Sequence, residues 1–458
     1  MAALLAASLI YTPVPLLLVI ALPAVFFYLT RPYPLLLLMV FLIPFNFVFK
    51  VGPIPLAAEL LKVFAWVPFL IALAAGRQSF KTSRHNWAFA VLGGLVILSL
   101  FRSNDLPFTF KEALRLVFNL GFCYLLINLV DSREKVVQVF KVLACSTFLV
   151  ACYGFYQFAI QDFGALFWIV NPRIDTSLSH GRDVFWEWRN RITSVLTSEM
   201  ELGHYFNLCL PVSLALWLGE GRRRLLSPWL WIALATLAGL LLTFTFGAWL
   251  ALLITAAAFI LVFSWNQHRK MVAAGGLVLL LAGWLVWFGP LRPLVQARLS
   301  GDAIGGLAWD VYTRWASWAL ALRAWSSHPL IGIGYGNFPY LSVGNLPFLT
   351  RAWTASGSSP HNIYVFLLAE LGVLGLGAVL LIVLRTLRSN FQLRKSPPLG
   401  GIALALLFGL TTAFIGGCLD DSPLYGPHTS YLVWLFIGLS EALLAIAGPV
   451  SAAAKGRE

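Results

Sequence analysis

Long runs of apolar residues recur along almost the whole chain, and short polar connections separate them. Runs of about 18 or more apolar residues are long enough to cross the hydrocarbon core of a bilayer as α-helices. A transmembrane barrel would instead need alternating apolar and polar segments of about 10 residues, and the sequence has no such pattern. We therefore predict an all-α polytopic membrane protein with about 12 transmembrane helices, forming a single integral membrane domain over residues 1–458.

The number of apolar runs gives 12 or 13 helices. They centre on residues 8–29, 34–49, 54–75, 87–101, 112–130, 136–160, 202–218, 228–246, 248–265, 271–289, 361–384, 399–417 and 429–448. Before residue 76 the count is odd and would leave the N-terminus outside. We expect one of four prolines to break a segment there: Pro13, Pro15, Pro34 or Pro44.

The charge of the connections predicts how the chain is oriented. Short connections rich in Lys and Arg mark the cytoplasmic side of a membrane. From residue 76 onward they alternate regularly with the other connections, and they cover residues 77–84, 133–135, 222–224, 269–270 and 385–395. We therefore expect residues 161–201 and 290–360 to form a first and a large extracytoplasmic loop. The chain would then cross the membrane several times, with these two loops on the side opposite the cytoplasm.

Composition and charge exclude several other classes of protein. Of the 458 residues 59% are hydrophobic and 11% charged, and the net charge of +13 is spread over short clusters rather than gathered in a basic domain. We therefore expect membrane lipids and no nucleic acid as partners. The five cysteines lie in or beside apolar runs without a CxxC pair, so we expect neither disulfides nor a metal site. The first basic residue is Arg31, which argues against a cleavable signal peptide.

The two long outer loops are rich in arginine. They contain nine arginines and no lysine, although arginine outside the membrane runs against the usual charge bias. Single arginines could lie at the headgroup interface with their stems in the apolar region. As a set, however, they favour bidentate recognition of phosphate or carboxylate groups.

The segment HPLIGIGYGNF in the large loop contains Gly332, Gly334 and Gly336. Glycines at this density let the backbone turn tightly or approach a ligand closely. The spacing GxGxG differs from a nucleotide-binding fingerprint, and no strand precedes it. The pattern leaves open whether this is a structural turn or a loop that faces a ligand.

His361 follows Pro360 and begins an apolar run, so we expect it at the N-terminus of a helix near the outer interface. The positive end of the helix dipole favours a neutral imidazole there, which is a competent general base. A purely capping or interfacial histidine is the alternative. Glu370 lies nine residues further on apolar ground, where it needs an arginine or a hydrogen bond from a neighbouring helix. The pattern does not decide between a structural and an active-site role for Glu370.

Asp420 and Asp421 lie in the last outer loop. Adjacent acids point in different directions on a regular backbone, so we interpret them as loop residues or arginine partners rather than as a catalytic pair. No Ser-His-Asp triad and no HExxH spacing is visible, which disfavours hydrolytic and metal-dependent chemistry.

Residues 310–377 resemble the core of a known superfamily. The resemblance rests on three motifs: YTRWASWALALRAW, which contains Arg314, the segment HPLIGIGYGNF, and PHNIYVFLLAELGVLGLG after a long outer loop. In this order they are similar to the O-antigen ligase and O-antigen polymerase superfamily of membrane glycosyltransferases. A looser similarity extends from residue 185 to residue 265.

The resemblance implies a GT-C-like fold and a specific reaction. The donor would be a glycan linked to undecaprenyl diphosphate, and the acceptor a sugar hydroxyl of lipid A–core, with no metal or other cofactor. By correspondence with the family motifs, Arg191 and Arg314 would hold the diphosphate and His361 would be the catalytic base. The substrate-binding residues expected around them are Arg189, Asn362, Gly334, Tyr335, Gly336 and Glu370.

One position departs from the superfamily pattern. Many members carry an arginine after a Thr-x-Ser step at the outer end of a helix, whereas this chain reads LTFTFGAW, with Phe246 at that place. Either Arg314 or another loop arginine supplies the missing charge, or the chemistry of this member is altered.

Three other activities remain open at this point. An O-antigen polymerase differs from a ligase only in its acceptor, and transfer to a protein hydroxyl belongs to the same class. A small-anion transporter is an alternative from a different class. Transporters tend to have repeated halves and ionisable groups near the midplane, whereas here the charges crowd at one end.

Overall fold

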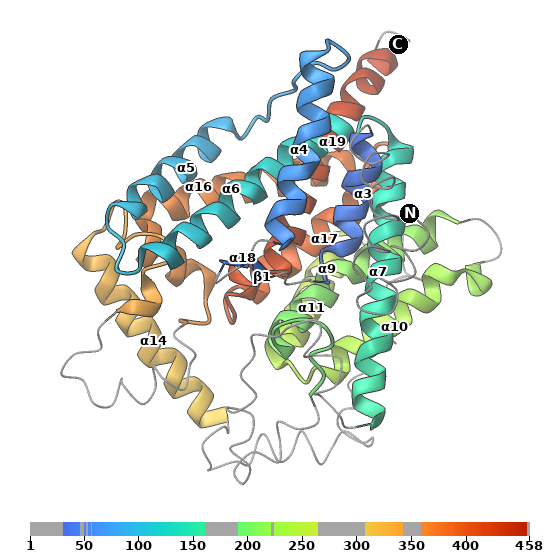
Figure 1. The fold of residues 1–458 in the computed structure, drawn as a ribbon. Helices are drawn as coiled ribbons and strands as arrows, with labels where there is room; N and C mark the ends of the chain where they lie inside the picture. The colour runs from blue at the N-terminus through green and yellow to red at the C-terminus, as the bar shows by residue number, and fades with distance from the viewer. Residues whose placement is uncertain are drawn as a thin grey trace, which may run out of the picture.

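The computed structural model shows a bundle of α-helices (Figure 1). It describes residues 31–45, 50–51, 54–55, 57–160, 191–220, 224–263, 307–341 and 359–455. The expected helices at 8–29 and 271–289, and Arg189, lie outside the described residues.

The principal helices follow the apolar runs of the sequence. In chain order they are α3 (Pro32–Leu42), α4 (Ala57–Ala74), α5 (Asn86–Leu100), α6 (Leu106–Leu129), α7 (Arg133–Ile160), α9 (Glu199–Gly219), α10 (Pro228–Leu242), α11 (Phe246–Phe263), α14 (Leu307–Ser327), α16 (Ile363–Leu393), α17 (Gly400–Gly416), α18 (Ser422–Tyr425) and α19 (Thr429–Lys455). Two 3₁₀ turns, Arg224–Leu226 and Phe338–Tyr340, complete the helical elements of the described chain. A short antiparallel pair, β1 (Lys50–Val51) and β2 (Ile54–Pro55), precedes α4.

Length and composition identify the chain as a multi-pass membrane protein. Among the described residues, five helices are long and apolar enough to cross a membrane: α6, α7, α9, α16 and the first 20 residues of α19. Five shorter apolar helices of 10–17 residues accompany them. The expected α-helical membrane fold is therefore confirmed, and the total of about 12 spans stays a prediction.

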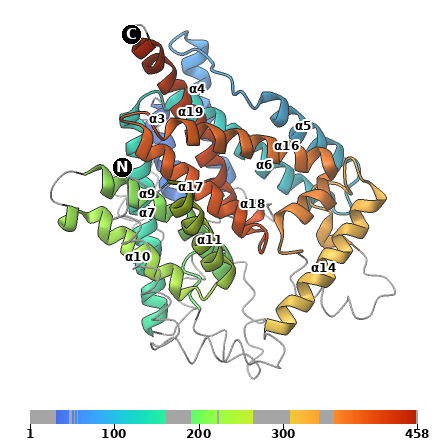
Figure 2. The same cartoon turned by 180° about the vertical axis from the view of Figure 1, so that it is seen from behind.

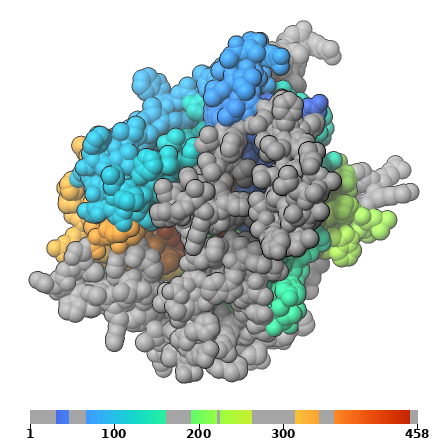
Figure 3. Space-filling view, viewed as in Figure 1, coloured from blue at the N-terminus to red at the C-terminus, as the bar shows by residue number. Residues whose placement is uncertain are grey.

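The helices pack in two groups that meet at α16, α17 and α19. In the first group α9 packs against α10 and α17, and α11 against α17. In the second, α16 packs against α5 and α14, and α6 against α19 (Figures 1 and 2). On the face shown in Figure 3, the blue and cyan surface of α5 and α6 lies beside the orange surface that belongs to α14 and the segment after it.

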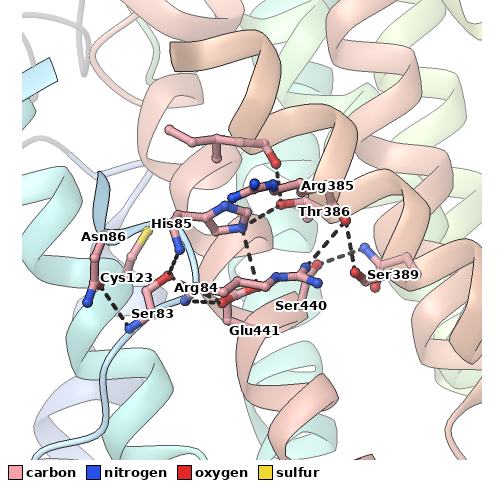
Figure 4. A network of polar contacts seen from close by, with 12 residues as sticks. Ser83, Arg84, His85, Asn86, Cys123, Arg385, Thr386, Ser389, Ser440 and Glu441 are labelled. Atoms are coloured by element: carbon pink, nitrogen blue, oxygen red, sulfur yellow. Dashed lines mark hydrogen bonds and ion pairs between the residues drawn. The ribbon is translucent and has the colours of Figure 1, made fainter. Parts of the chain in front are cut away.

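A polar network ties the helices together at the end of α16 and α19 that lies away from His361 (Figure 4). Its centre is Glu441 on α19, which accepts hydrogen bonds from Ser83 Oγ at 3.2 Å and Arg84 Nε at 2.5 Å. Nε2 of the buried His85 lies 3.3 Å from Glu441 and 3.3 Å from Thr386 Oγ1 on α16. This network joins the basic connection before α5 to α16 and α19, and so fixes one end of the helix that begins at the candidate site.

The large outer loop contains a helix that the apolar pattern did not predict. Helix α14 lies within the expected loop 290–360 and presents one apolar face to α16. Leu320, Ala321 and Ala324 pack there with Phe366 and Ala369. Charged and polar residues, among them Arg314 and Arg323, interrupt its apolar residues, so the segment as a whole is less apolar than a spanning helix.

Candidate functional site

The glycine-rich segment lies against α16 at a break in that helix. Gly372 has φ +65° inside α16, and Ile333 N and Gly334 N donate to the carbonyls of Ala369 and Glu370 at 2.9 Å. A Cβ on Gly332 would lie 2.3 Å from the carbonyl carbon of Glu370. Gly332 and Gly372 therefore permit a direct backbone contact, which supports the interpretation of this segment as a structural turn.

The rest of the turn packs on α5 and α6. Tyr335 is buried, and its N–H donates to Ser99 Oγ on α5 at 2.7 Å. A Cβ on Gly336 would lie 3.4 Å from Cα of Thr109 on α6. Gly334, Tyr335 and Gly336 thus lie between helices, and Tyr335 reaches the candidate site through its ring contact with Tyr425, at 5.8 Å between centroids.

Glu370 is fully buried and has the hydrogen-bond partners that its position demands. One carboxylate oxygen accepts from Phe338 N at 3.1 Å, and the other accepts from the hydroxyl of Tyr425 on α18 at 3.3 Å. The expected hydrogen bond to a neighbouring helix is confirmed. Glu370 therefore fixes the glycine turn and α18 relative to α16.

His361 is held just before the first turn of α16. Its backbone has φ +48°, its N–H donates to Ser359 Oγ at 3.1 Å, and the carbonyl of Pro360 accepts from Trp318 Nε1 of α14 at 2.7 Å. Left-handed backbone is uncommon for a residue with a side chain and calls for an explanation at the site where it occurs. Here the bonds at Ser359 and Pro360 hold the backbone that leads into His361.

Asn362 caps α16, at the helix start that the sequence predicts beside His361. Its Oδ1 accepts from Tyr364 N at 3.0 Å and Val365 N at 3.1 Å, which satisfies two of the unpaired N–H groups of a helix start. Its Nδ2 donates to the carbonyl of Cys418 at 3.0 Å. This second bond joins the start of α16 to the loop after α17, so Asn362 positions His361 beside that loop.

The loop after α17 brings two carboxylates to His361. Asp421 Oδ1 lies 3.8 Å from His361 Nδ1, and its Oδ2 accepts from Ser359 Oγ at 2.6 Å. Asp420 Oδ1 accepts from the N–H and the hydroxyl of Ser422 at 2.7 and 2.6 Å. One ligand atom from each of His361, Asp420 and Asp421 lies within 4.8 Å of the others. From the sequence alone both acids are expected to be loop residues or arginine partners, because nothing in a linear pattern shows that the α17 loop meets α16.

The two carboxylates have different protonation behaviour. Burial by itself raises the pKa of Asp420, but His204, His361 and the two Ser422 donors together hold that pKa below its ordinary value. For Asp421, burial and the neighbouring Asp420 charge raise the pKa despite His361 and Ser359. Since Asp420 Oδ1 already accepts two hydrogen bonds, we interpret the cluster as a histidine–carboxylate arrangement rather than as a metal site.

Arg314 reaches the same loop from α14. Its guanidinium donates to the carbonyl of Leu419, one residue before the carboxylates. A Cβ on Gly247, next to Phe246, would lie 3.5 Å from Cβ of Leu419. Leu419 therefore lies close both to Arg314 and to the start of α11, where Phe246 stands in the place of the superfamily's arginine.

Arg191 lies at the turn between α10 and α11. Its Nε donates to the carbonyl of Thr243 at 3.0 Å, its Nη2 donates to Thr245 Oγ1 at 3.3 Å, and its Nη1 pairs with Glu199 at 2.8 Å. Phe246 packs its ring on Trp249, with 5.1 Å between centroids. The guanidinium is 6% exposed, so an anionic ligand would have to take the place of Glu199.

Comparisons with known proteins identify the family. Residues 231–380 match the model of a family described as O-antigen ligase. The chain is also 28% identical over 242 residues to an O-antigen ligase of Pseudomonas aeruginosa. Both matches support the expected relation to the O-antigen ligase superfamily.

The two matches cover only part of the proteins concerned. The chain spans about half the length of the curated relative that it matches, with 52% of this chain and 53% of the relative aligned. The segment matched by the O-antigen ligase family includes Arg314, His361 and Glu370, whereas Arg191 and the two aspartates lie outside it. The expected similarity to the superfamily is confirmed, and the donor, the acceptor and the roles of single residues are proposals.

Proposed function

We propose that the protein is an O-antigen ligase that transfers a glycan from undecaprenyl diphosphate to a sugar hydroxyl of lipid A–core. The reaction would take place at the periplasmic face of the bacterial inner membrane, without a metal. The observation that carries the proposal is the meeting of His361, Asp421 and Arg314 at the start of α16, in a chain of the O-antigen ligase superfamily.

The negative charge of the leaving group requires cationic donors, and the arginines can supply them. The bond between the anomeric carbon and the phosphate oxygen breaks, and the undecaprenyl diphosphate departs as an anion. Guanidinium groups stabilise such charge by bidentate hydrogen bonds. The position of Arg314 at the Leu419 carbonyl supports this role. Arg191 would join it by exchanging Glu199 for the diphosphate, and Arg189 lies outside the described residues.

The acceptor hydroxyl requires a base, and His361 can serve as that base. A sugar hydroxyl must lose its proton as its oxygen bonds to the anomeric carbon, and a neutral imidazole can take that proton. Asp421, 3.8 Å from Nδ1 of His361, would hold the ring with its other nitrogen toward the acceptor. The imidazolium then returns the proton to the departing diphosphate or to solvent, so that the charges balance.

Deletion of the gene tests the proposal in the cell. If the protein is a ligase, the mutant accumulates glycan on undecaprenyl diphosphate and makes rough lipopolysaccharide without attached glycan. Core capped with a single repeat would instead identify an O-antigen polymerase and refute ligation. Lipopolysaccharide unchanged from wild type would refute both activities.

A further inference from the structure

A second imidazole, besides that of His361, lies close to Asp420. His204 on α9 is fully buried, and its Nε2 is 3.9 Å from Asp420 Oδ2. In the described part of the chain neither of its ring nitrogens has a hydrogen-bond partner. Buried polar groups are nearly always satisfied, so an unpartnered buried imidazole facing a carboxylate calls for a functional explanation.

The structure leaves room for this ring at one glycine. A Cβ on Gly416, the last residue of α17, would lie 2.4 Å from His204 Cε1 and 2.9 Å from its Nδ1. The loop that carries Asp420 and Asp421 begins directly after Gly416. The position of the imidazole therefore depends on the same helix end that presents the carboxylates.

The charges around His204 come from several elements. Asp420 faces it from the α17 loop, Arg314 from α14, and Glu201 from one turn earlier on α9. His361 also lies near Asp420, and His428, before α19, is bound to Glu201 with 3.2 Å between its Nδ1 and Oε1. Ser422 occupies the Oδ1 atom of Asp420, so Oδ2 is the atom left to His204.

We propose that His204 is a positioning residue that offsets the charge of Asp420 and so keeps Asp421 ionised as the acceptor for His361. This inference rests on the proposed function, because it concerns the orientation of the proposed base. Two neighbouring carboxylates oppose each other's ionisation, and a nearby imidazolium or imidazole N–H relieves that opposition. Without His204, the charge on Asp420 acts on Asp421 with less compensation, and Asp421 takes up a proton at higher pH.

The pH dependence of transfer tests this arrangement in the full-length protein in lipid nanodiscs. His204→Phe keeps a flat ring of similar size and removes both nitrogens. In the pH–rate profile the acid limb is the range in which the transfer rate falls as the pH drops. We expect this limb to move to higher pH by about one unit, while the transfer rate on the alkaline plateau changes little. Gly416→Ala, which displaces the ring without removing it, should move the limb in the same direction. His204→Gln, which retains an N–H donor, should move it less.

A glycine in the same helix provides the matched control. A Cβ on Gly409 would meet Phe436 Cε2 at 2.5 Å, so Gly409→Ala disturbs α17 packing away from His204. It should lower the thermal stability without moving the acid limb. If Gly409→Ala moves the limb as far as His204→Phe does, the effect is one of packing and the proposal is wrong.

An infrared titration of protonated carboxyl groups separates this proposal from the proposed function. The band that disappears in Asp421→Asn reports Asp421, and in His204→Phe it should titrate at higher pH than in wild type. If His204→Phe shows this shift while the wild-type protein transfers no glycan, the pairing of His204 with Asp420 is supported and the ligase activity is refuted. An unchanged band together with an unchanged rate profile would overturn the role of His204.

Discussion

At the scale of single residues, His361 and Arg314 meet at one loop but differ in what they can do. Arginine stays protonated and cannot act as a base, whereas histidine can. We expect His361→Ala to leave donor binding nearly intact and to lower transfer by about 10²–10⁴-fold, the usual range for loss of a general base. Arg314→Ala should weaken donor binding as well, by up to about 1.5–3 kcal/mol of charge-assisted hydrogen bonding.

Separate binding and transfer assays with a defined undecaprenyl-diphosphate glycan distinguish the two roles. The assignment of His361 as base fails if His361→Ala transfers at the wild-type rate. It fails equally if that variant loses activity only because the donor no longer binds.

Substitutions of Arg191 and of its partner Glu199 should change donor binding in opposite directions. Its guanidinium pairs with Glu199 at 2.8 Å, so a diphosphate has to compete with that carboxylate. Glu199→Gln removes the competing charge and should tighten donor binding, whereas Arg191→Ala should weaken it by up to about 1.5–3 kcal/mol. Equilibrium binding of the lipid-linked donor measures both. Equal weakening by the two substitutions would mean that the pair is structural and does not receive the diphosphate.

At the scale of elements, the break in α16 holds the glycine turn against the helix that presents His361. A Cβ on Gly372 would lie 2.4 Å from the carbonyl carbon of Leu330, at a backbone angle of φ +65°. We expect Gly372→Ala to destabilise the fold by more than the roughly 1–2 kcal/mol of left-handed backbone strain, because the contact is lost as well. Transfer activity should fall with it, since the turn and Glu370 position α18.

Gly377 is the matched control for this change. It lies further along α16, and a Cβ at this position would have no neighbouring atom within 4 Å. Gly377→Ala should therefore stabilise the helix by about 0.5–1 kcal/mol. Thermal unfolding in detergent compares the two variants, and similar behaviour of both would show that the break in α16 contributes nothing to stability.

At the scale of the whole molecule, the charge pattern predicts which end of the bundle faces outward. Ser358 lies in the predicted large outer loop, and Ser79 is exposed in the basic connection before α5. In a variant without the five native cysteines, Ser358→Cys should react with an impermeant maleimide in intact spheroplasts, and Ser79→Cys only after lysis. The reverse pattern would place the candidate site on the cytoplasmic side and would exclude a periplasmic ligase.

The membrane class, most of the helices and one residue of the site could be predicted from the amino-acid sequence. Apolar runs set the helices because the bilayer demands internal hydrogen bonding over a fixed length. The place of His361 at a helix N-terminus was predicted because it follows a proline at the start of such a run, and Asn362 caps α16 there. The motifs around Arg314 and the glycine turn identified the superfamily.

Which of these residues meet depends on how the helices pack. Asp420 and Asp421 lie close to His361 because Asn362 and Ile363 bind the carbonyls at the end of α17, which are more than 50 positions away in the chain. Helix α14 was missed because Arg314, Arg323 and three serines interrupt its apolar residues, and its packing on α16 stabilises a segment that is less apolar than a spanning helix. Hydrophobic periodicity shows which face of a segment is buried. A site formed where α14, α16 and the loop after α17 meet depends on long-range contacts, which no local sequence pattern contains.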